Sequence, residues 1–299
     1  MWQYVHPRYW LHWLAILLLW LISLLPYRLT AYLGRGLGAL LYRIAGRRAH
    51  IVRTNLRLCF PELDGEQREQ LMRAHFRALG QAMLTIGINL FASRRRLQRL
   101  VKISDRRYFD EAINAGKPVI LLAPHFLAME IAGLVLAPER HMLSMYQKIR
   151  NPLVDSLVRR SRSRFGGIMI ERKSDMRKLI RMVRDGSPLY YLPDQDPGSS
   201  DKVFAPFFGI QTAVTPGLSR FARLSKAVVI PCFTRMLPSG AGYEVIFMPP
   251  LENFPSADPV ADARRMNEVI ELAIRQAPEQ YFWVHRRFKS RPEGEGSVY

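Results

Sequence analysis

Runs of aliphatic residues alternate with segments of helical spacing from residue 118 onward. The strand-like runs cover 118–123, 142–146, 188–193, 227–234 and 243–248, and the helical patterns cover 126–136, 151–164, 175–185, 216–225 and 260–276. The run 118–123 is continuously aliphatic, which is typical of a parallel strand buried on both faces. This alternation predicts an α/β fold, with a mixed, mostly parallel sheet flanked by helices on both faces.

The amino-terminal part of the chain follows a different pattern. Residues 9–25 are almost entirely apolar, interrupted only by His12 and Ser23. A helix of this length is about 25 Å long, at the short end of what spans a bilayer. The run ends without the small residues of a signal-peptide cleavage site, so we expect a retained membrane anchor. Only Arg8 precedes the run whereas several arginines follow it, which places the rest of the chain in the cytoplasm.

The next segment mixes aliphatic residues with Gly34, Gly36, Gly38 and isolated arginines. This pattern suits a helix at the membrane interface or against the anchor, and a plain amphipathic core helix explains it nearly as well. Residues 66–90 predict a long helix. The expected organisation is an anchor at 1–28, an interfacial segment at 29–60 and one catalytic domain at 61–299.

Charge indicates the kind of partner. The chain of 299 residues has 44 Lys and Arg against 25 Asp and Glu, a net charge of +19. This excess predicts an anionic partner, such as a lipid surface, a phosphorylated substrate, an acidic protein or a nucleic acid. No nucleic-acid-binding motif is visible, so we expect no nucleic acid. Cys59 and Cys232 are the only cysteines, too few for a disulfide framework or a zinc motif.

A histidine and a carboxylate follow the buried run 118–123. His125 lies at the carboxyl end of that predicted strand, where open α/β sheets bind their ligands, and Glu130 comes five residues later. Residues five apart in a helix point about 140° apart, so we expect His125 just outside the helix 126–136 and turned back toward Glu130. A carboxylate on one ring nitrogen would leave the other free to act as a general base. A strand-end histidine satisfied by its neighbours explains the pattern equally well.

Two further carboxylates, Asp194 and Asp196, follow the run 188–193. They could meet His125 across the same crevice, bind a divalent cation, or form a tight turn with Pro197 and Gly198. Because no other His or Asp stands at ligand spacing, we expect no metal and no cofactor. Nor is there a Gly-x-Ser-x-Gly elbow, so direct transfer is favoured over a covalent intermediate.

Other candidate site residues are cations and aromatic residues. Lys202 precedes three phenylalanines within 204–208. This combination suits a hydrophobic substrate with an anionic head group, and packing of the aromatic rings in the core explains it as well. Clusters of cations lie near inferred strand ends, and a minority of them could bind phosphate. The candidates are Lys148, Arg150, Arg172, Arg286 and Arg287.

Several motifs carry a resemblance to a known family. They are Pro124-His125-Phe126 through Glu130, Asn151-Pro152-Leu153 with Asp155, Pro193-Asp194-Gln195-Asp196, Val203-Phe204 through Phe208, and the tail from Ala277 to Pro292. Together they resemble the late acyltransferases of lipid A biosynthesis, of the lauroyl/myristoyl type, within the glycerolipid acyltransferase group that has the His-x4-Asp/Glu motif. Gln195 and Pro197 stand where many relatives have histidine and tyrosine, so acceptor position or donor length could differ.

This resemblance implies an O-acyltransferase of the Gram-negative inner membrane. It implies transfer of a fatty acyl chain from acyl carrier protein to a hydroxyl of a phosphorylated, acylated glucosamine disaccharide, with anionic membrane lipids as further partners and no stable protein partner. His125 would be the general base, Glu130 its orienting partner, and Asp194, Asp196 and Asn151 would support the site beside the cations named above. The alternative is an acyltransferase that acts on a glycerophospholipid or another membrane lipid, with an acyl-CoA or acyl carrier protein donor.

Overall fold

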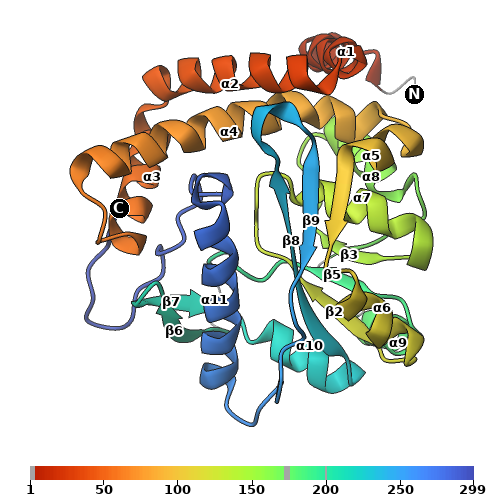
Figure 1. Ribbon diagram of the computed structural model, residues 1–299, viewed down its shortest axis with the longest axis vertical. Coiled ribbons are helices and arrows are strands. Elements are labelled where there is room, and N and C mark those ends of the chain that lie inside the picture. The colour runs from red at the N-terminus through yellow and green to blue at the C-terminus, as the bar shows by residue number, and fades with distance from the viewer. Residues whose placement is uncertain (1–3, 172–175, 199–200) are drawn as a thin grey trace.

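The computed structural model, which describes residues 4–171, 176–198 and 201–299, is built around a seven-stranded sheet (Figure 1). The strands lie in the order β1-β9-β8-β2-β5-β3-β4. Their bounds are β1 Val101–Ser104, β2 Val119–Leu122, β3 Leu143–Tyr146, β4 Ile168–Glu171, β5 Leu189–Tyr191, β8 Val228–Met236 and β9 Tyr243–Phe247. The strands from β8 to β4 are parallel, and β9 is antiparallel to β8. The predicted mixed, mostly parallel sheet is confirmed.

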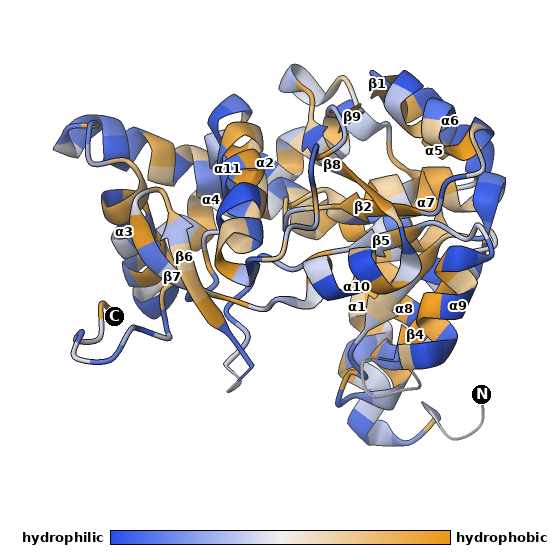
Figure 2. Ribbon diagram, turned by 90° about the horizontal axis from the view of Figure 1, so that it is seen from below, coloured by the Kyte–Doolittle hydropathy of each residue, from blue (hydrophilic) through white to orange (hydrophobic). Residues whose placement is uncertain are grey.

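Helices cover both faces of the sheet, as the sequence predicted. One face packs against α6 (Arg107–Asn114) and α7 (Met129–Arg140) through a cluster that includes Leu121 and Ile230. The other face packs against α9 (Met176–Arg184), α10 (Gly217–Ser225) and α11 (Pro259–Gln276) through a larger cluster with Ile120 and Leu122. Successive strand residues point to opposite faces, so a continuous apolar run supplies both clusters. Figure 2 shows the apolar strands enclosed by helices with polar outer faces.

A layer of helices closes one end of the sheet, at the top of Figure 1. Its members are α1 Trp10–Leu24, α2 Tyr27–Ile44, α3 Gly46–Cys59, α4 Gly65–Phe91 and α5 Arg94–Leu100. The long helix predicted at 66–90 is α4, which begins at a capping box formed by Asp64 and Gln67. The glycines of α2 allow close contact with α4, because a Cβ at Gly38 would lie 2.1 Å from the carbonyl oxygen of Phe76.

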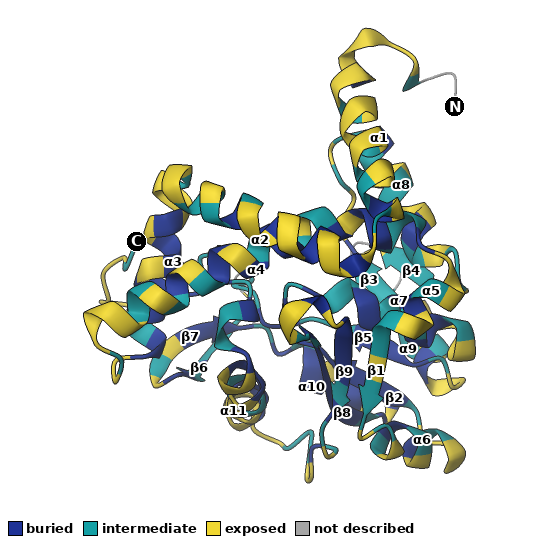
Figure 3. Cartoon of the chain, turned by 45° about the horizontal axis from the view of Figure 1, so that its top comes forward, coloured by how far each residue is buried: buried dark blue, intermediate teal, exposed yellow. Residues whose placement is uncertain are grey.

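The predicted anchor forms an exposed helix. A 3-10 turn, η2 (Pro7–Tyr9), leads into α1, and Pro7–Leu24 is the one stretch of the described chain with the length and composition to cross a membrane. Only 11% of this stretch is buried. Figure 3 shows α1 extending from the body with most of its surface exposed.

The carboxyl-terminal tail changes the start of α7. The sequence predicted a helix from residue 126, but Phe126 forms an antiparallel bridge with Tyr281, and the amide of Phe282 donates to the carbonyl of His125. The tail therefore keeps residues 125–127 out of the helix, and α7 begins at Met129. A hairpin that the sequence did not reveal, β6 (Val203–Phe207) and β7 (Ile210–Val214), packs beside α11.

The remaining elements are short or lie at the edge of the sheet. They are α8 Pro152–Ser163 beside β4, and the 3-10 turns η3 Pro238–Gly240 and η4 Pro278–Gln280. The structure brings the carboxyl ends of β2, β5 and β3 to one edge of the sheet, and the candidate site lies there.

Candidate active site

His125 and Asp194 lie side by side because they follow neighbouring parallel strands. Leu122 of β2 is paired with Tyr191 of β5, and the amide of Ala123 donates to the carbonyl of Tyr191. His125 comes two residues after Ala123, and Asp194 comes three residues after Tyr191. The amide of His125 donates to Oδ2 of Asp194 at 2.8 Å, and its Nδ1 lies 2.5 Å from Oδ1 of the same carboxylate. The expectation that Asp194 meets His125 across the crevice is therefore realised as a direct contact.

The environment of Asp194 keeps its carboxyl ionised. The side chain is fully buried, and burial alone would raise its pKa. His125, by the charge of its ring and by the hydrogen bonds of its ring and its backbone amide, outweighs that effect and lowers the pKa of Asp194, with help from Arg287. An ionised carboxylate at Nδ1 favours the tautomer with its proton on Nδ1, so Nε2 of His125 is the nitrogen left to accept a proton. The histidine side chain itself is 18% exposed.

Glu130 has a different partner from the one predicted. Its carboxylate accepts two hydrogen bonds from Arg162 of α8, one from Nε at 2.8 Å and one from Nη2. The Arg162 guanidinium bridges α8 to the first turn of α7, where a negative charge is also favourable. This corrects the prediction that Glu130 orients His125: the tail delays α7, and Asp194 occupies the position at Nδ1.

A cavity of about 540 Å³ opens beside His125, within the usual range of about 300–1,000 Å³ for small-molecule sites. Its wall on α7 carries Met129, Glu130, Gly133, Leu134 and Ala137, which are apolar apart from Glu130. A Cβ added at Gly133 would meet no atom within 4 Å, so this position faces open space. The wall elsewhere is made by side chains of mixed character, which include Met142, Met145, Met176, Gln195, Asp196 and Arg220. The cavity thus combines an apolar wall with a polar region near the histidine.

Asp196 lines this cavity and also secures the tail. Its carboxylate accepts from the amide and hydroxyl of Ser290 at 2.7 and 2.9 Å and from the amide of Gly198 at 2.9 Å. Its own amide donates to Nε2 of His285, which is therefore neutral. Burial, Arg287 and His125 lower the pKa of His285 to about 4. Asp196 thus forms the predicted turn with Gly198. In the part of the chain that the structure describes, no three His, Cys, Asp or Glu residues form a group that could hold a metal ion.

The predicted cations are spread over several environments. Arg287 is 1% exposed, donates to the carbonyl of Ala213 at 2.8 Å and lies over the ring of Phe207, so it is part of the core behind His125. Arg287 was one of the cations that could bind phosphate, but its burial in the core does not fit that role. Arg286 lies over the ring of Tyr299, and both residues are half-buried. Lys202 is half-buried just before β6.

The remaining predicted residues lie around α8 or outside the described chain. Lys148 and Arg150 are exposed on the loop that follows the cavity residue Gln147. Asn151 caps α8 by accepting from two backbone amides, and its side-chain nitrogen lies 2.8 Å from Nε2 of His12. Arg172 lies outside the described residues.

The sequence did not identify two residues that the structure places at the site. Arg162 lies among other arginines in the sequence, and nothing in its spacing distinguished it. Asn55 donates to the carbonyls of Trp283 and His285 and accepts from the hydroxyl of Tyr299, so it holds the tail that positions His125. In the sequence, only a weak resemblance of residues 55–61 to the same acyltransferase family could have pointed to it.

The fold and the site define an enzyme whose histidine, held by a buried carboxylate, faces a cavity suited to a lipid chain. The model of the bacterial lipid A biosynthesis acyltransferases matches residues 1–290, and the chain belongs to this family. It is 38% identical over 99% of its length, and over 96% of the relative, to the lipid A biosynthesis lauroyltransferase of Escherichia coli strain K12.

Other relatives are similar along their whole length. A lipid A biosynthesis acyltransferase of Haemophilus influenzae is 39% identical, with coverage of 98% of this chain and 92% of the relative. The lipid A biosynthesis palmitoleoyltransferase of Escherichia coli strain K12 is 35% identical, with coverage of 99% and 97%. This chain is accordingly an O-acyltransferase of lipid A biosynthesis that associates with membranes.

Proposed function

We propose that the protein transfers a fatty acyl chain from the thioester of acyl carrier protein to a hydroxyl of a phosphorylated, acylated glucosamine disaccharide, with His125 as general base. The observation that carries this proposal is the pairing of His125 with buried Asp194 at a cavity that has an apolar wall on α7. The family membership supports the acyl chemistry.

The proposed reaction is a direct transfer. Nε2 of His125 takes the proton of the acceptor hydroxyl while the hydroxyl oxygen attacks the thioester carbonyl carbon. The tetrahedral intermediate then breaks its C–S bond, and the proton on His125 passes to the departing thiolate. Asp194 stabilises the transient imidazolium and keeps the ring in one orientation. The thioester is already activated, so proton transfer and positioning are the tasks left to the protein.

Charge supports an acidic carrier as the donor. α9 and α10 pack together at the end of the molecule opposite α1 and α2 (Figure 1), and the first residues of both helices reach the cavity. Exposed cations on these helices and at their ends include Arg181, Arg184, Arg223 and Lys226. We expect Arg181→Glu with Lys226→Glu to raise KM for acyl carrier protein about tenfold and to leave the rate with acyl-pantetheine unchanged. An equal effect on both donors would contradict this docking site.

The proposed location is the cytoplasmic face of the inner membrane. The apolar α1 provides the attachment, and the arginines that follow it favour the cytoplasmic leaflet, whose surface is negatively charged. There the enzyme has access both to soluble acyl carrier protein and to an acceptor that stays in the bilayer.

The reaction can be tested with detergent-solubilised protein, a Kdo-extended tetraacyl lipid A precursor and acyl carrier proteins carrying C10 to C16 chains. Mass spectrometry should show one added acyl chain. We expect His125→Ala to lower the rate at least about 10²-fold, whereas His50→Ala, at an exposed position on α3, should leave the rate unchanged. Acylation of a glycerophospholipid from acyl-CoA, with no product on the disaccharide, would favour the alternative acyltransferase instead.

A further inference from the structure

One face of α1 is less exposed than the others. The less exposed residues are His12, Ile16, Leu19 and Ser23, together with Ile22. The spacing of the first four, at three and four residues, places them on a single stripe. The other side chains of α1, which include Trp10, Trp13, Leu17 and Trp20, are exposed. The side of α1 that carries this stripe therefore faces the domain.

Contacts at both ends of α1 hold it there. Near its start, Nε2 of His12 lies 2.8 Å from the side-chain nitrogen of Asn151 on α8, and the hydroxyl of Tyr4 donates to the carbonyl of Pro152 at 3.3 Å. At its end, Arg96 of α5 donates to the carbonyls of Ser23 and Leu25. In between, α4 comes so close that a Cβ at Gly87 would lie 2.2 Å from the carbonyl oxygen of Leu19.

These contacts conflict with a helix that crosses the bilayer. His12 and Ser23 are about 16 Å apart along a helix. If α1 stood upright in the membrane, the start of α8 would lie about 16 Å deeper in the bilayer than α5. The exposed Lys148 and Arg150, which precede α8, would then enter the hydrocarbon. Burying such charges in lipid is costly. A helix that lies in the plane of the membrane avoids that cost.

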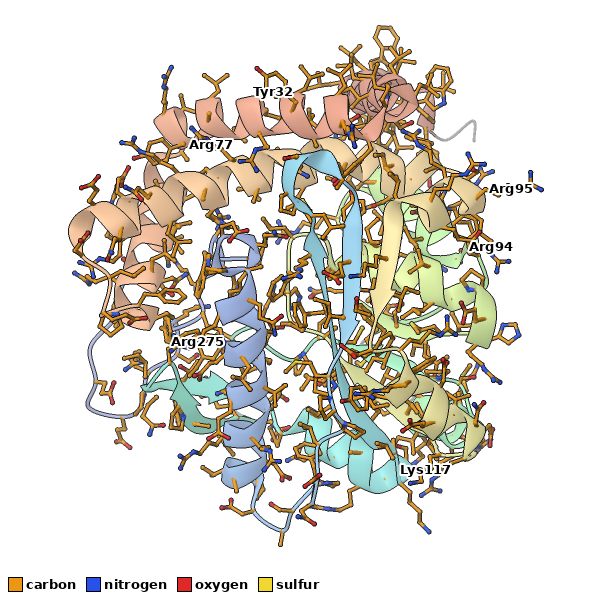
Figure 4. All side chains as sticks on the ribbon, in the orientation of Figure 1. Tyr32, Arg77, Arg94, Arg95, Lys117 and Arg275 are labelled. Atoms are coloured by element: carbon orange, nitrogen blue, oxygen red, sulfur yellow. The ribbon has the colours of Figure 1, made fainter. Side chains whose placement is uncertain are left out.

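The second helix has a surface that fits the same plane. In Figure 1, α1 is seen end-on and α2 lengthwise at the same height, so both run across the top of the molecule. The outer side of α2 exposes a stripe of large apolar side chains, and Figure 4 places Tyr32 on that side. The members of the stripe are Leu29, Tyr32, Leu33, Leu40 and Ile44. Exposed arginines stand along the same helix at Arg28, Arg35 and Arg43.

We propose that α1 and the outer stripe of α2 lie in one leaflet of an anionic bilayer, parallel to its plane, so that the amino terminus and the catalytic domain are on the same side of the membrane. The apolar side chains enter the acyl region, and the arginines pair with anionic headgroups, as in other interfacial helices. The protein is then monotopic, and α1 does not cross the membrane. This proposal is independent of the reaction that the enzyme catalyses.

Cysteine labelling tests which side the amino terminus occupies. The native Cys59 and Cys232 are 1% and 0% exposed, so an impermeant maleimide reports on an introduced cysteine. We would compare Val5→Cys, at a position that is 59% exposed, with Lys117→Cys at the opposite end of the molecule in Figure 4. In spheroplasts the two cysteines should behave alike: either both react before the membrane is permeabilised, or both react only afterwards. Reaction of one without permeabilisation, while the other requires it, would overturn the proposal.

Two further measurements keep the test decisive. If lipid shields Val5→Cys from the maleimide in every condition, a protease-cleavable tag ahead of Met1 is used instead. Cleavage of the tag should then require permeabilisation only if labelling of Lys117→Cys does. Separately, the full-length protein is reconstituted in phosphatidylethanolamine and phosphatidylglycerol vesicles with a fluorophore on Tyr32→Cys or on Lys117→Cys. Spin-labelled lipids should quench the first and leave the second unchanged. Equal quenching at both positions, or none at Tyr32→Cys, would exclude insertion of α2.

Discussion

Gly133 offers a direct test of where the acyl chain binds. This residue lies on the apolar wall of the cavity, one turn along α7 from Glu130, and a side chain there would extend into space that no atom occupies. Gly133→Leu adds four carbons to that space. If the donor chain fills it, the variant excludes the last methylenes of a long chain. At about 0.8 kcal/mol for each buried methylene, a loss of four amounts to about 3 kcal/mol.

That free energy corresponds to about a 10²-fold change in relative kcat/KM. We expect Gly133→Leu to shift the preference toward a donor about four carbons shorter, and Gly133→Ala, which adds one carbon, to change it only about fourfold. The alanine variant is also the control for the removal of a helix glycine. Competition among acyl carrier proteins with C8 to C16 chains, read by mass spectrometry, measures the shift. An unchanged donor profile with a lower overall rate would refute the reasoning, because the acyl chain would then lie elsewhere.

Two other substitutions test the electrostatics. Asp194→Asn should lower kcat about 10²–10⁴-fold, because the ring of His125 loses the charge that orients it. Glu130→Gln should lower kcat by a smaller factor. A larger loss of kcat for Glu130→Gln than for Asp194→Asn would show that Glu130 is the orienting group. Burial lowers the pKa of His75 to about 4 in the folded protein, whereas the unfolded chain has the ordinary value of about 6.5. As the pH falls between these values, the unfolded state binds a proton that the folded state does not, so the free energy of unfolding falls by about 3 kcal/mol by pH 4. His75→Gln, which can keep a hydrogen bond to the carbonyl of Glu279, should therefore lose less unfolding free energy between pH 7 and 4.5 in denaturant titrations; an unchanged pH dependence would contradict this assignment.

Local patterns were sufficient to predict most of the elements. The run 118–123 became β2 and the pattern 260–276 became α11, because buried strands and amphipathic helices are encoded by their own side chains. The hairpin of β6 and β7 was not apparent, since its residues Lys202 to Gly209 could equally be a substrate segment or an aromatic core. Its strands are paired with each other and packed under α11, and such tertiary contacts leave no periodic signal in a short segment.

The site shows where local reasoning stops. The spacing of His125 and Glu130 correctly brought both residues to one cavity, but which carboxylate contacts the ring depends on two features of the whole fold. One is the strand order, which sets β5 beside β2 and so delivers Asp194. The other is the tail, whose bridge to Phe126 delays α7 and turns Glu130 toward Arg162. Both features join segments that are far apart in the chain; His125 and Asp194, for example, are 69 residues apart. A motif thus identifies the residues that reach the cavity, and the long-range pairing of strands and tail decides how they are paired.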